Sequence, residues 1–205
     1  MKYSVRHLTS YVYADPVSLS HHVVHLVPRP DNGQRCTFRE LRVTPTPALR
    51  RERIDAFGNR VIYFSIEDAH RQLAVEAQSE VTVTAASCPA LQSGIAWDAV
   101  RDRLCKDRRA DVLDAYALTF NSPYVKAHAA LGAYATPSFP PGRPLLDAVM
   151  DLTSRIHDEF TYDPRATNLS TPLDEVLRNR RGVCQDFAHL PIGCLRALGL
   201  AGRYV

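Results

Sequence analysis

The sequence predicts an α+β fold, in which an antiparallel β-sandwich-like domain comes first and a helical region follows. Two observations predict this order. Residues 72–84 alternate strictly between apolar and polar side chains, as expected of a strand with one buried face. Residues 145–160 instead carry apolar side chains at helical spacing. The pattern changes near residue 87, so we expect the β domain to span residues 1–86.

Other segments of the first 86 residues also have the character of strands. Tyr3, Val5 and Tyr11 share one parity within a first strand. Residues 56–66, AFGNRVIYFSI, are typical of a turn at Gly58 that leads into a more fully buried strand. Several strands joined by short turns favour a sandwich or a curled antiparallel sheet.

The remainder is predicted to divide into a linker with helices, residues 87–142, and a helical core, residues 143–205. The stretch SCPALQSG is typical of a linker. Ser122 and Pro123 predict a helix start, because serine is a favoured N-cap and proline is favoured at the first helical position.

Three helices are expected in the core. Pro144 opens the first, and its apolar face consists of Leu145, Val149, Leu152, Ile156 and Phe160. Thr171 predicts the second start, with Asp174 placed as in a capping box. The last helix is predicted to begin near Cys184 and to end at Gly199, a residue suited to the left-handed position after a helix.

Composition narrows the possible functions. The chain has 205 residues, is 45% hydrophobic and 23% charged, and carries a net charge of +3. These values are ordinary for a globular domain, and the mild positive charge predicts neither a nucleic-acid nor a membrane partner. The sequence contains no apolar run long enough to span a bilayer and no secretory signal at its start. Five scattered cysteines without a C-x-x-C pair favour a reducing compartment, so we expect a cytoplasmic protein.

Cys184 is the strongest candidate for a catalytic residue. If Gly182 supplies a tight turn, the Cys184 sulfur lies near the unpaired N–H groups and the positive end of the last helix, which favour thiolate over thiol. Nearby arginines at positions 178, 180 and 181 act in the same direction. A thiolate at this position is suited to nucleophilic attack on an acyl carbon. The alternative is a structural cysteine without catalytic function.

The residues around the thiol would form the rest of the predicted site. Val183, Gln185 and Asp186 flank Cys184, and their backbone N–H groups could hold a developing oxyanion. Cys194 lies about 15 Å further along the same helix at roughly 1.5 Å per residue, and is predicted to pack as a small apolar residue.

The segment RRGVCQDFAHLPIGCLRALGLAGRYV closely resembles the nucleophile segment of the microbial transglutaminase-like superfamily. The stretches TSYVYADPVSLSHHVVHLVPRP, DAFGNRVIYF and LAVEAQSEVTV resemble the β domain that precedes this core in bacterial members, and FTYDP resembles the segment upstream of the cysteine. The resemblance implies a papain-like or transglutaminase core, of which residues 143–205 form the front half. It also implies that Cys184 works with a histidine and an aspartate, and that no metal or organic cofactor takes part.

In the family this histidine and aspartate follow the nucleophile helix, and no histidine of this sequence matches that position. His189 lies about 140° around the helix from Cys184, at roughly 100° per residue, and is expected to point away from the sulfur. His157, near the end of its helix, is expected at the surface. Pro191 inside the last helix, and Gly202 after it, depart from the family pattern; Pro191 removes one helical hydrogen bond.

The stretch SHHVVH raises the question of a metal site. On a strand His21 and His25 share a face but lie about 13 Å apart at roughly 3.3 Å per residue, and His22 faces the other way. Three histidines so placed do not close on one zinc ion, so we expect no metal there.

The resulting hypothesis is a transglutaminase-like cysteine enzyme, a protease, amidase or acyl transferase, that acts on amide or peptide bonds through a Cys184 thioester. The chain is expected to be inactive alone, because it lacks the downstream partners. Two alternatives stay open. One is a non-catalytic binding or scaffold module that retains the fold. The other is completion of the core by another chain, which predicts self-association through exposed apolar surface.

Overall fold

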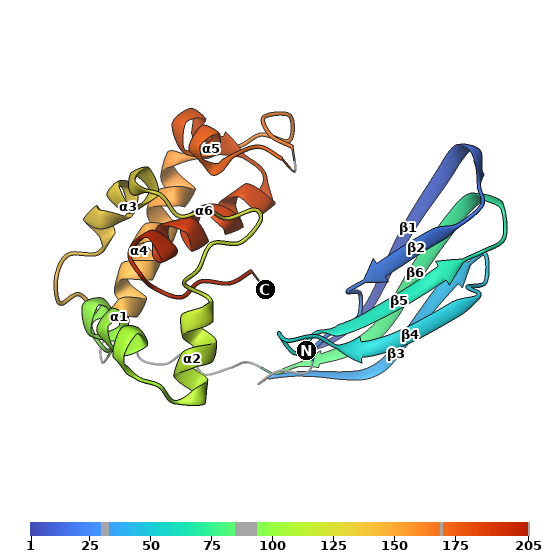
Figure 1. Cartoon of the computed structure of the whole chain (residues 1–205), viewed down its shortest axis with the longest axis horizontal. Helices are drawn as coiled ribbons and strands as arrows, with labels where there is room; N and C mark the ends of the chain where they lie inside the picture. Colours follow the sequence, from blue (N-terminus) through green and yellow to red (C-terminus); the bar gives the residue numbers. More distant parts are fainter. Residues whose placement is uncertain (30–32, 85–93, 169, 205) are drawn as a thin grey trace. The chain divides into compact units, whose positions relative to one another are not determined.

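A computed structural model describes residues 1–29, 33–84, 94–168 and 170–204 of the chain (Figure 1). The chain divides into two compact units, Met1–Cys88 and Pro89–Val205. The first unit is built from antiparallel strands, and the second from helices with one two-stranded parallel sheet. The predicted α+β class and the β-rich N-terminal part are confirmed.

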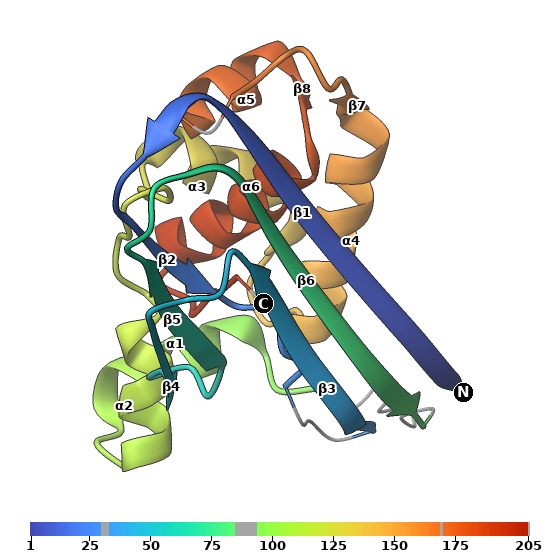
Figure 2. The ribbon, with the colours of Figure 1, turned by 90° about the vertical axis from the view of Figure 1, so that its right-hand side faces the viewer.

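The first unit contains two antiparallel three-stranded sheets. Sheet one has the order β1-β6-β3, with bounds Lys2–Val17, His70–Val83 and Gln34–Thr44. Sheet two has the order β2-β5-β4, with bounds Ser20–Val24, Arg60–Ile66 and Leu49–Ile54. Figure 2 shows β6 running between β1 and β3 along most of their length.

Alternation along β6 determines which face of sheet one is buried. Its inward side chains, with those of β3 and β5, form a buried core made of Leu41, Ile62, Phe64, Ile66, Leu73, Val75 and Ala77. The tight turn before β5 is also as predicted, because Gly58 has a φ of 79°. The Asp55 carboxylate accepts hydrogen bonds from the N–H groups of Phe57 and Asn59 and stabilises this turn.

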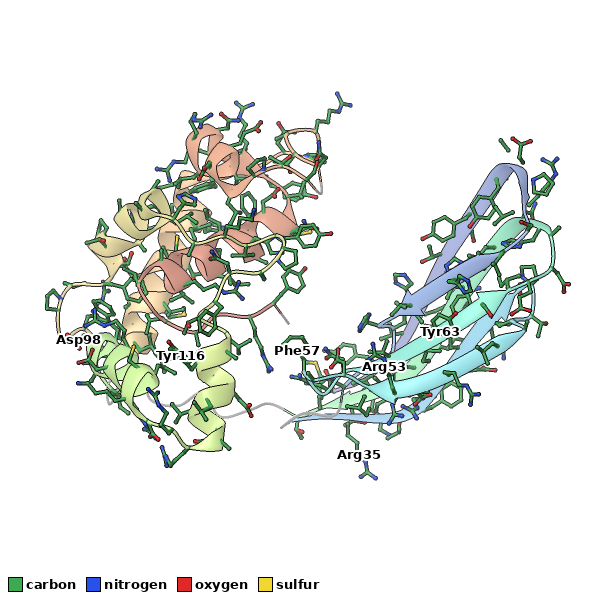
Figure 3. All side chains as sticks on the ribbon, in the orientation of Figure 1. Arg35, Arg53, Phe57, Tyr63, Asp98 and Tyr116 are labelled. Carbon is green, nitrogen blue, oxygen red and sulfur yellow. The ribbon has the colours of Figure 1, made fainter. Side chains whose placement is uncertain are left out.

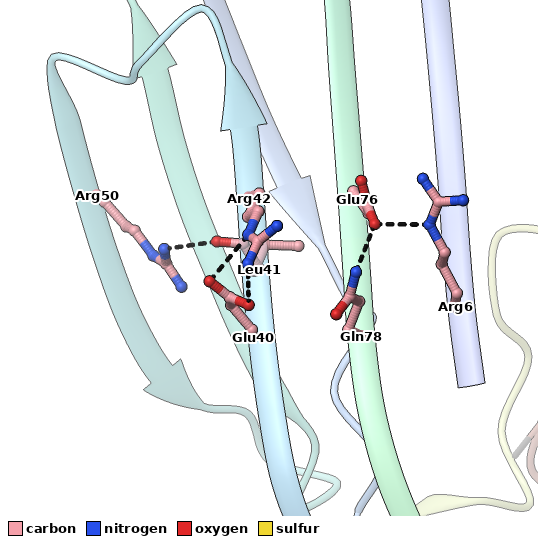
Figure 4. Close-up of polar contacts among 7 residues, drawn as sticks. All are labelled: Arg6, Glu40, Leu41, Arg42, Arg50, Glu76 and Gln78. Atoms are coloured by element: carbon pink, nitrogen blue, oxygen red, sulfur yellow. Dashed lines mark hydrogen bonds and ion pairs between the residues drawn. The ribbon is translucent and has the colours of Figure 1, made fainter. Parts of the chain in front are cut away.

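Polar side chains fasten the strands on the outside (Figure 4). Glu76 on β6 accepts hydrogen bonds of 2.6 Å from Arg6 on β1 and from Gln78. These two donors hold the pKa of the Glu76 carboxyl at about 2. Arg50 on β4 donates to the carbonyl of Leu41 on β3 at 3.1 Å and so joins the two sheets.

The second unit is helical. Its elements are α1 (Trp97–Lys106), α2 (Ala110–Ala117), α3 (Ala129–Ala135), η2 (Thr136–Ser138), α4 (Leu145–Glu159), α5 (Leu173–Asn179) and α6 (Cys184–Ala197). The parallel pair β7 (Thr161–Tyr162) and β8 (Arg181–Gly182) lies between α4 and α6 in the sequence. α6 contacts α3, α4 and α5. Gly193 allows α6 to pack closely on α3, because a Cβ there would lie 2.8 Å from Cδ1 of the buried Leu131, whose side chain would have to shift.

Most predicted helix limits in this unit are confirmed. α4 begins after Pro144 and buries Leu152 and Ile156 as expected. α6 begins at Cys184, and Gly199 after it has a φ of 78°. Pro191 does not end α6, which continues to Ala197. Across the ranges that the structure describes, no helix combines the length and apolarity that crossing a membrane would require.

The predicted helix start at Ser122 and Pro123 is wrong. Ser122 and Val125 instead exchange backbone hydrogen bonds of 2.9 and 3.2 Å in a tight turn, and α3 begins only at Ala129. The Ser122 hydroxyl accepts a hydrogen bond from Arg196 of α6 at 2.9 Å, so it caps no helix.

The cap predicted at Thr171 is also wrong, although α5 does begin close by. The N-cap of α5 is Pro172, and the Thr171 hydroxyl accepts a hydrogen bond from the N–H of Asn168 at 2.9 Å. The hydroxyl therefore stabilises the preceding loop and leaves the first turn of α5 without a side-chain cap.

Candidate active site

Cys184 occupies the first position of α6, and its side chain is exposed. The preceding residue, Val183, is the N-cap, with extended φ and ψ of −113° and 178°. The chain therefore turns sharply into the helix at the thiol. This arrangement places the sulfur at the end of α6 where backbone N–H groups are unpaired and the helix dipole is positive.

The strand before the thiol is fixed by β7. Thr161 donates its N–H to the carbonyl of Arg180 at 2.9 Å, and Asp163 donates to the carbonyl of Gly182 at the same distance. These two bonds form the short parallel pair of β7 and β8. They hold the backbone as far as two residues before Cys184.

Asp186 holds the turn from the helix side. Its side chain is buried, at 4% exposure, and Oδ2 accepts the N–H of Val183 at 2.8 Å and the hydroxyl of Thr167 at 2.5 Å. A carboxylate at the third helical position that binds the N-cap N–H is half of a capping box. Because Val183 has no polar side chain, the reciprocal bond of that motif is absent.

Gly182 is required by the same contact. A Cβ on Gly182 would lie 2.8 Å from Asp186 Oδ2 and 2.9 Å from Asp186 Cβ, closer than real Cβ atoms approach. Glycine is therefore needed in this turn for a steric reason, because the Asp186 carboxylate occupies the position where a side chain of residue 182 would lie.

These hydrogen bonds show which of the predicted backbone N–H groups are free to donate to an oxyanion. The N–H of Val183 already donates to Asp186, and the Asp186 carboxylate is occupied by the turn. The N–H groups of Cys184, Gln185 and Asp186 are the first three of the helix and have no intrahelical acceptor, since the first such bond runs from Phe187 to Val183. They are the donors that remain suitably placed for an oxyanion beside the sulfur.

A cavity of about 380 Å³, which no sequence pattern predicted, lies beside the first turn of α6 and is lined on the helix by Gln185, Asp186 and His189. Across it lie Lys126 and the pair His128 and Asp174. His128 Nε2 is 2.5 Å from Asp174 Oδ1, yet the angle does not meet hydrogen-bond geometry. The pair is therefore a close polar contact between the imidazole and the carboxylate. No local sequence signal links two residues this far apart.

His189 belongs to this cavity. Its ring stacks on Tyr124 with centroids 6.3 Å apart and meets Tyr204 edge-on at 5.6 Å. Burial lowers the pKa of His189, and nearby Arg196 acts in the same direction against Asp186. His189 is therefore a neutral ring packed between tyrosines.

A second, apolar groove follows the face of α6 that carries the thiol. Phe187 and Pro191 lie three and seven residues after Cys184, which places them on the same side of the helix. With Phe160 and Tyr162 they line a groove of about 410 Å³. His157 lies at its edge with 87% of its side chain exposed, which confirms its expected surface position.

The arginines before Cys184 do not act as one group. Arg180 forms an ion pair with Glu159 at 2.9 Å, and Arg181 approaches Asp163 at 3.9 Å. Arg178 is exposed and makes no ion pair within the described residues. Cys194 is fully buried, and this burial raises the pKa of its thiol to about 12, consistent with a packing role.

The histidines of SHHVVH lie in the first unit. His21 accepts or donates a 2.7 Å hydrogen bond with the Tyr63 hydroxyl on β5, a residue labelled in Figure 3. His22 faces the other side of the sheet and stacks on Phe64 at 4.8 Å, and His25 lies 3.8 Å from Asp55. Among the described residues no group of three His, Cys, Asp or Glu side chains could hold a metal ion.

Two protein-family models match parts of the chain. Residues 3–82 match the model of the bacterial transglutaminase-like N-terminal region, and residues 134–205 match the model of the transglutaminase-like superfamily. The chain belongs to the transglutaminase-like superfamily. The matched core region includes the whole of α6, so Cys184 lies within the part of the chain that carries the family pattern.

Curated relatives extend the match beyond the two models. The chain is 40% identical over its full length to an uncharacterized protein of Mycobacterium tuberculosis, of which it covers 64%. It is 33% identical to an uncharacterized protein of Mycobacterium leprae, with 98% of this chain and 68% of the relative covered. This transglutaminase-like chain thus spans about two thirds of the length of its curated relatives.

A solved structure shows the same fold. The chain superposes with a TM-score of 0.72 on the crystal structure of a proposed cysteine protease from Cytophaga hutchinsonii, over 98% of this chain and 65% of the other. The sequence identity is 20%, so this likeness supports the transglutaminase-like fold alone.

Proposed function

We propose that this chain is the nucleophile-bearing part of a transglutaminase-like cysteine enzyme that acts on amide or peptide bonds. The observation that carries the proposal is the exposed thiol of Cys184 at the first position of α6, on a turn held by Asp186. A buried carboxylate that fixes the backbone around an exposed thiol is typical of a site that must present its sulfur in one orientation.

The proposed reaction has two stages. The Cys184 thiolate attacks the amide carbonyl, the carbon–nitrogen bond breaks, and the amine leaves with a proton from a general acid, so that a thioester forms. The N–H groups of Cys184 and Gln185 stabilise the negative oxygen during the attack. Water then returns the thiol and a carboxylate, or a second amine returns the thiol and a new amide. The proton lost by water or amine goes to the conjugate base of that general acid, which is thereby restored.

The base is proposed to come from outside this chain. His189 packs between tyrosines, and His157 is exposed at the far edge of the apolar groove. The curated relatives are longer by about a third of their own length, and we place the histidine and aspartate partners in that remaining part. All four described cysteines are free, which fits the proposed reducing, cytoplasmic setting.

An activated ester tests the nucleophile without the missing acid, because p-nitrophenolate needs no proton to leave. We expect N-acetylglycine p-nitrophenyl ester to acylate Cys184 at least about 10-fold faster than Cys105, an exposed thiol in the last turn of α1. Peptide mass mapping over time gives both rates within one sample. Equal acylation of the two thiols would favour the non-catalytic binding module, as would full amidase activity of a longer relative without this cysteine.

A further inference from the structure

Arg180 lies four residues before Cys184 and ends α5. Its φ is positive, at 54°, and among the described residues every other residue with a positive φ is a glycine. Side chains with a Cβ rarely adopt this left-handed backbone, and they persist there when the surroundings hold them. The contacts of the Arg180 side chain therefore stabilise this backbone conformation.

The side chain of Arg180 is bound on three sides. Its guanidinium lies 4.6 Å from the ring centre of Tyr134 and 4.8 Å from that of Phe160, and both rings are 8% exposed. Nη1 donates to Glu159 Oε2 at 2.9 Å. Arg155 joins the same cluster, at 4.6 Å from Tyr134 and 3.2 Å from the other oxygen of Glu159. A planar guanidinium fits such a site, where a point-charge ammonium does not.

The ring of Tyr134 is suited to hold a cation. Burial, together with the neighbouring Glu159 carboxylate, raises the pKa of Tyr134 to about 12, so the phenol stays neutral. A neutral aromatic face attracts a guanidinium through its quadrupole. The Glu159 carboxylate pairs with both arginines and offsets one of their two positive charges.

The backbone of Arg180 links this side-chain cluster to the segment that carries Cys184. Its N–H donates to Val176 of α5 at 2.9 Å, and its carbonyl accepts from Thr161 of β7 at 2.9 Å. The left-handed turn therefore ends α5 and directs the chain into β8, from which Val183 and Cys184 follow. A movement at Arg180 would change the direction in which β8 delivers the cysteine.

We propose that Arg180 is a positioning residue for Cys184, which acts through the backbone of β8 and is fixed by Glu159, Tyr134 and Phe160. This inference rests on the proposed function in one respect, the identity of the nucleophile. It also differs from the role that the sequence predicts for Arg180, which is to favour the thiolate through its charge. The guanidinium of Arg180 is fixed by Glu159 and the two aromatic rings, so the role assigned here is geometric, and the variants below separate it from an effect of charge.

The test compares alkylation of Cys184 by anionic iodoacetate and by neutral iodoacetamide. Both reagents need the same thiolate, so the ratio of their rates cancels the thiolate fraction and reports the local field at the sulfur. In the native chain we expect the unpaired N–H groups to raise this ratio at least about 3-fold above that of Cys184 in the urea-unfolded chain.

Two variants separate geometry from charge. Arg180→Gly accepts the left-handed backbone without the anchor, and Glu159→Gln breaks the ion pair while it adds net positive charge. We expect both to lower the rate ratio toward the unfolded value, with thermal unfolding still cooperative. A direct effect of charge predicts the opposite for Glu159→Gln, a higher ratio. The matched control Arg178→Ala removes an exposed, unpaired charge and should leave the ratio unchanged.

The proposal is overturned if the rate ratio of Glu159→Gln stays unchanged or rises. It is also overturned if Arg178→Ala lowers the rate ratio as much as the two variants do. If Arg180→Gly fails to fold, Glu159→Gln still decides. Arg180→Lys provides a rescue test, since it keeps the charge without the planar group and should recover little of the ratio. Alkylation needs no turnover, so failure of the ester test would remove the enzyme assignment and leave this inference standing.

Discussion

The Asp186 carboxylate accepts the N–H of Val183 at 2.8 Å, and this bond joins the third residue of α6 to the residue before it begins. The same oxygen accepts the hydroxyl of Thr167 from the loop that precedes α5. One buried carboxylate therefore connects the turn at Cys184 to a separate loop. The geometry of the thiol thus depends on a side chain whose Oδ2 is engaged by the turn and by the loop.

Substitution of Asp186 is predicted to destabilise the helical unit. Asp186→Ala leaves the N–H of Val183 and the hydroxyl of Thr167 without their buried acceptor, and we expect a loss of about 2–3 kcal/mol in the free energy of unfolding. Urea denaturation followed by circular dichroism measures it. Thr167→Val removes one of the two donors and should cost about 1 kcal/mol. An equal cost for both variants would contradict the central role of Asp186.

Gly182 gives a steric test of the same contact. Gly182→Ala places a Cβ against Asp186, where it would lie 2.8 Å from Oδ2, and the turn must shift to admit it. We expect a loss of about 1–3 kcal/mol, measured by urea denaturation. The control is Gly132→Ala in α3, whose Cβ would meet Ala197 at an ordinary 3.5 Å. That change should be neutral or stabilising by about 0.5 kcal/mol or more, since alanine favours helix.

The sequence predicted elements whose signal is local. Strict alternation along residues 72–84 predicted β6 and its buried face, because successive side chains of a strand point to opposite faces and the apolar ones lie on the buried face. The start of α6 at Cys184 and the left-handed Gly199 were also predicted from neighbouring residues. In each case the residues that determine the structure lie within one or two turns of each other.

Distant partners explain what the sequence did not predict. Ser122 resembles an N-cap, but its hydroxyl is taken by Arg196, 74 residues later. Arg180 resembled one member of a basic cluster, but Glu159, 21 residues earlier, fixes it in another role. Local propensity cannot show such contacts, since a side chain that caps a helix in isolation binds the stronger tertiary donor when one is near.

Arg196 is predicted to hold the loop before α3 and the tail after α6. Its guanidinium donates to the carbonyls of Leu118 and Gly202, at 3.0 and 2.8 Å, as well as to Ser122. Arg196→Met keeps the apolar stem and removes these bonds, so we expect a loss of about 2–3 kcal/mol in urea denaturation. Arg203→Met, a change at an exposed arginine of the tail, is the control and should stay within about 0.5 kcal/mol of the native chain.

His22 is predicted to make the β unit less stable in mild acid. Burial is the largest cause that lowers the pKa of His22, and the nearby His70 and His21 act in the same direction. The unfolded chain then binds more protons than the folded chain, so stability falls as the pH drops through about 6.5 and is unaffected above it. Urea unfolding between pH 7.5 and 5 should show this decline in the native chain.

The variant His22→Leu should reduce that decline, because the side chain no longer gains a proton on unfolding. His157→Gln, at a histidine whose side chain is 87% exposed, serves as the matched control and should leave the pH dependence as it is. A decline of equal size in all three proteins would assign the acid sensitivity to other groups.

Self-association is predicted at the apolar groove beside Cys184. Phe160, Tyr162, Phe187 and Pro191 line it, and Tyr162 is 62% exposed. Exposed apolar surface of this kind favours contact with a second copy when the chain stands alone. Sedimentation velocity should show a weight-average mass that rises with concentration, and Tyr162→Glu should shift the curve toward monomer. Tyr124→Glu, at a tyrosine of the polar cavity, should leave it unchanged. A single monomer at high concentration would exclude association through this face.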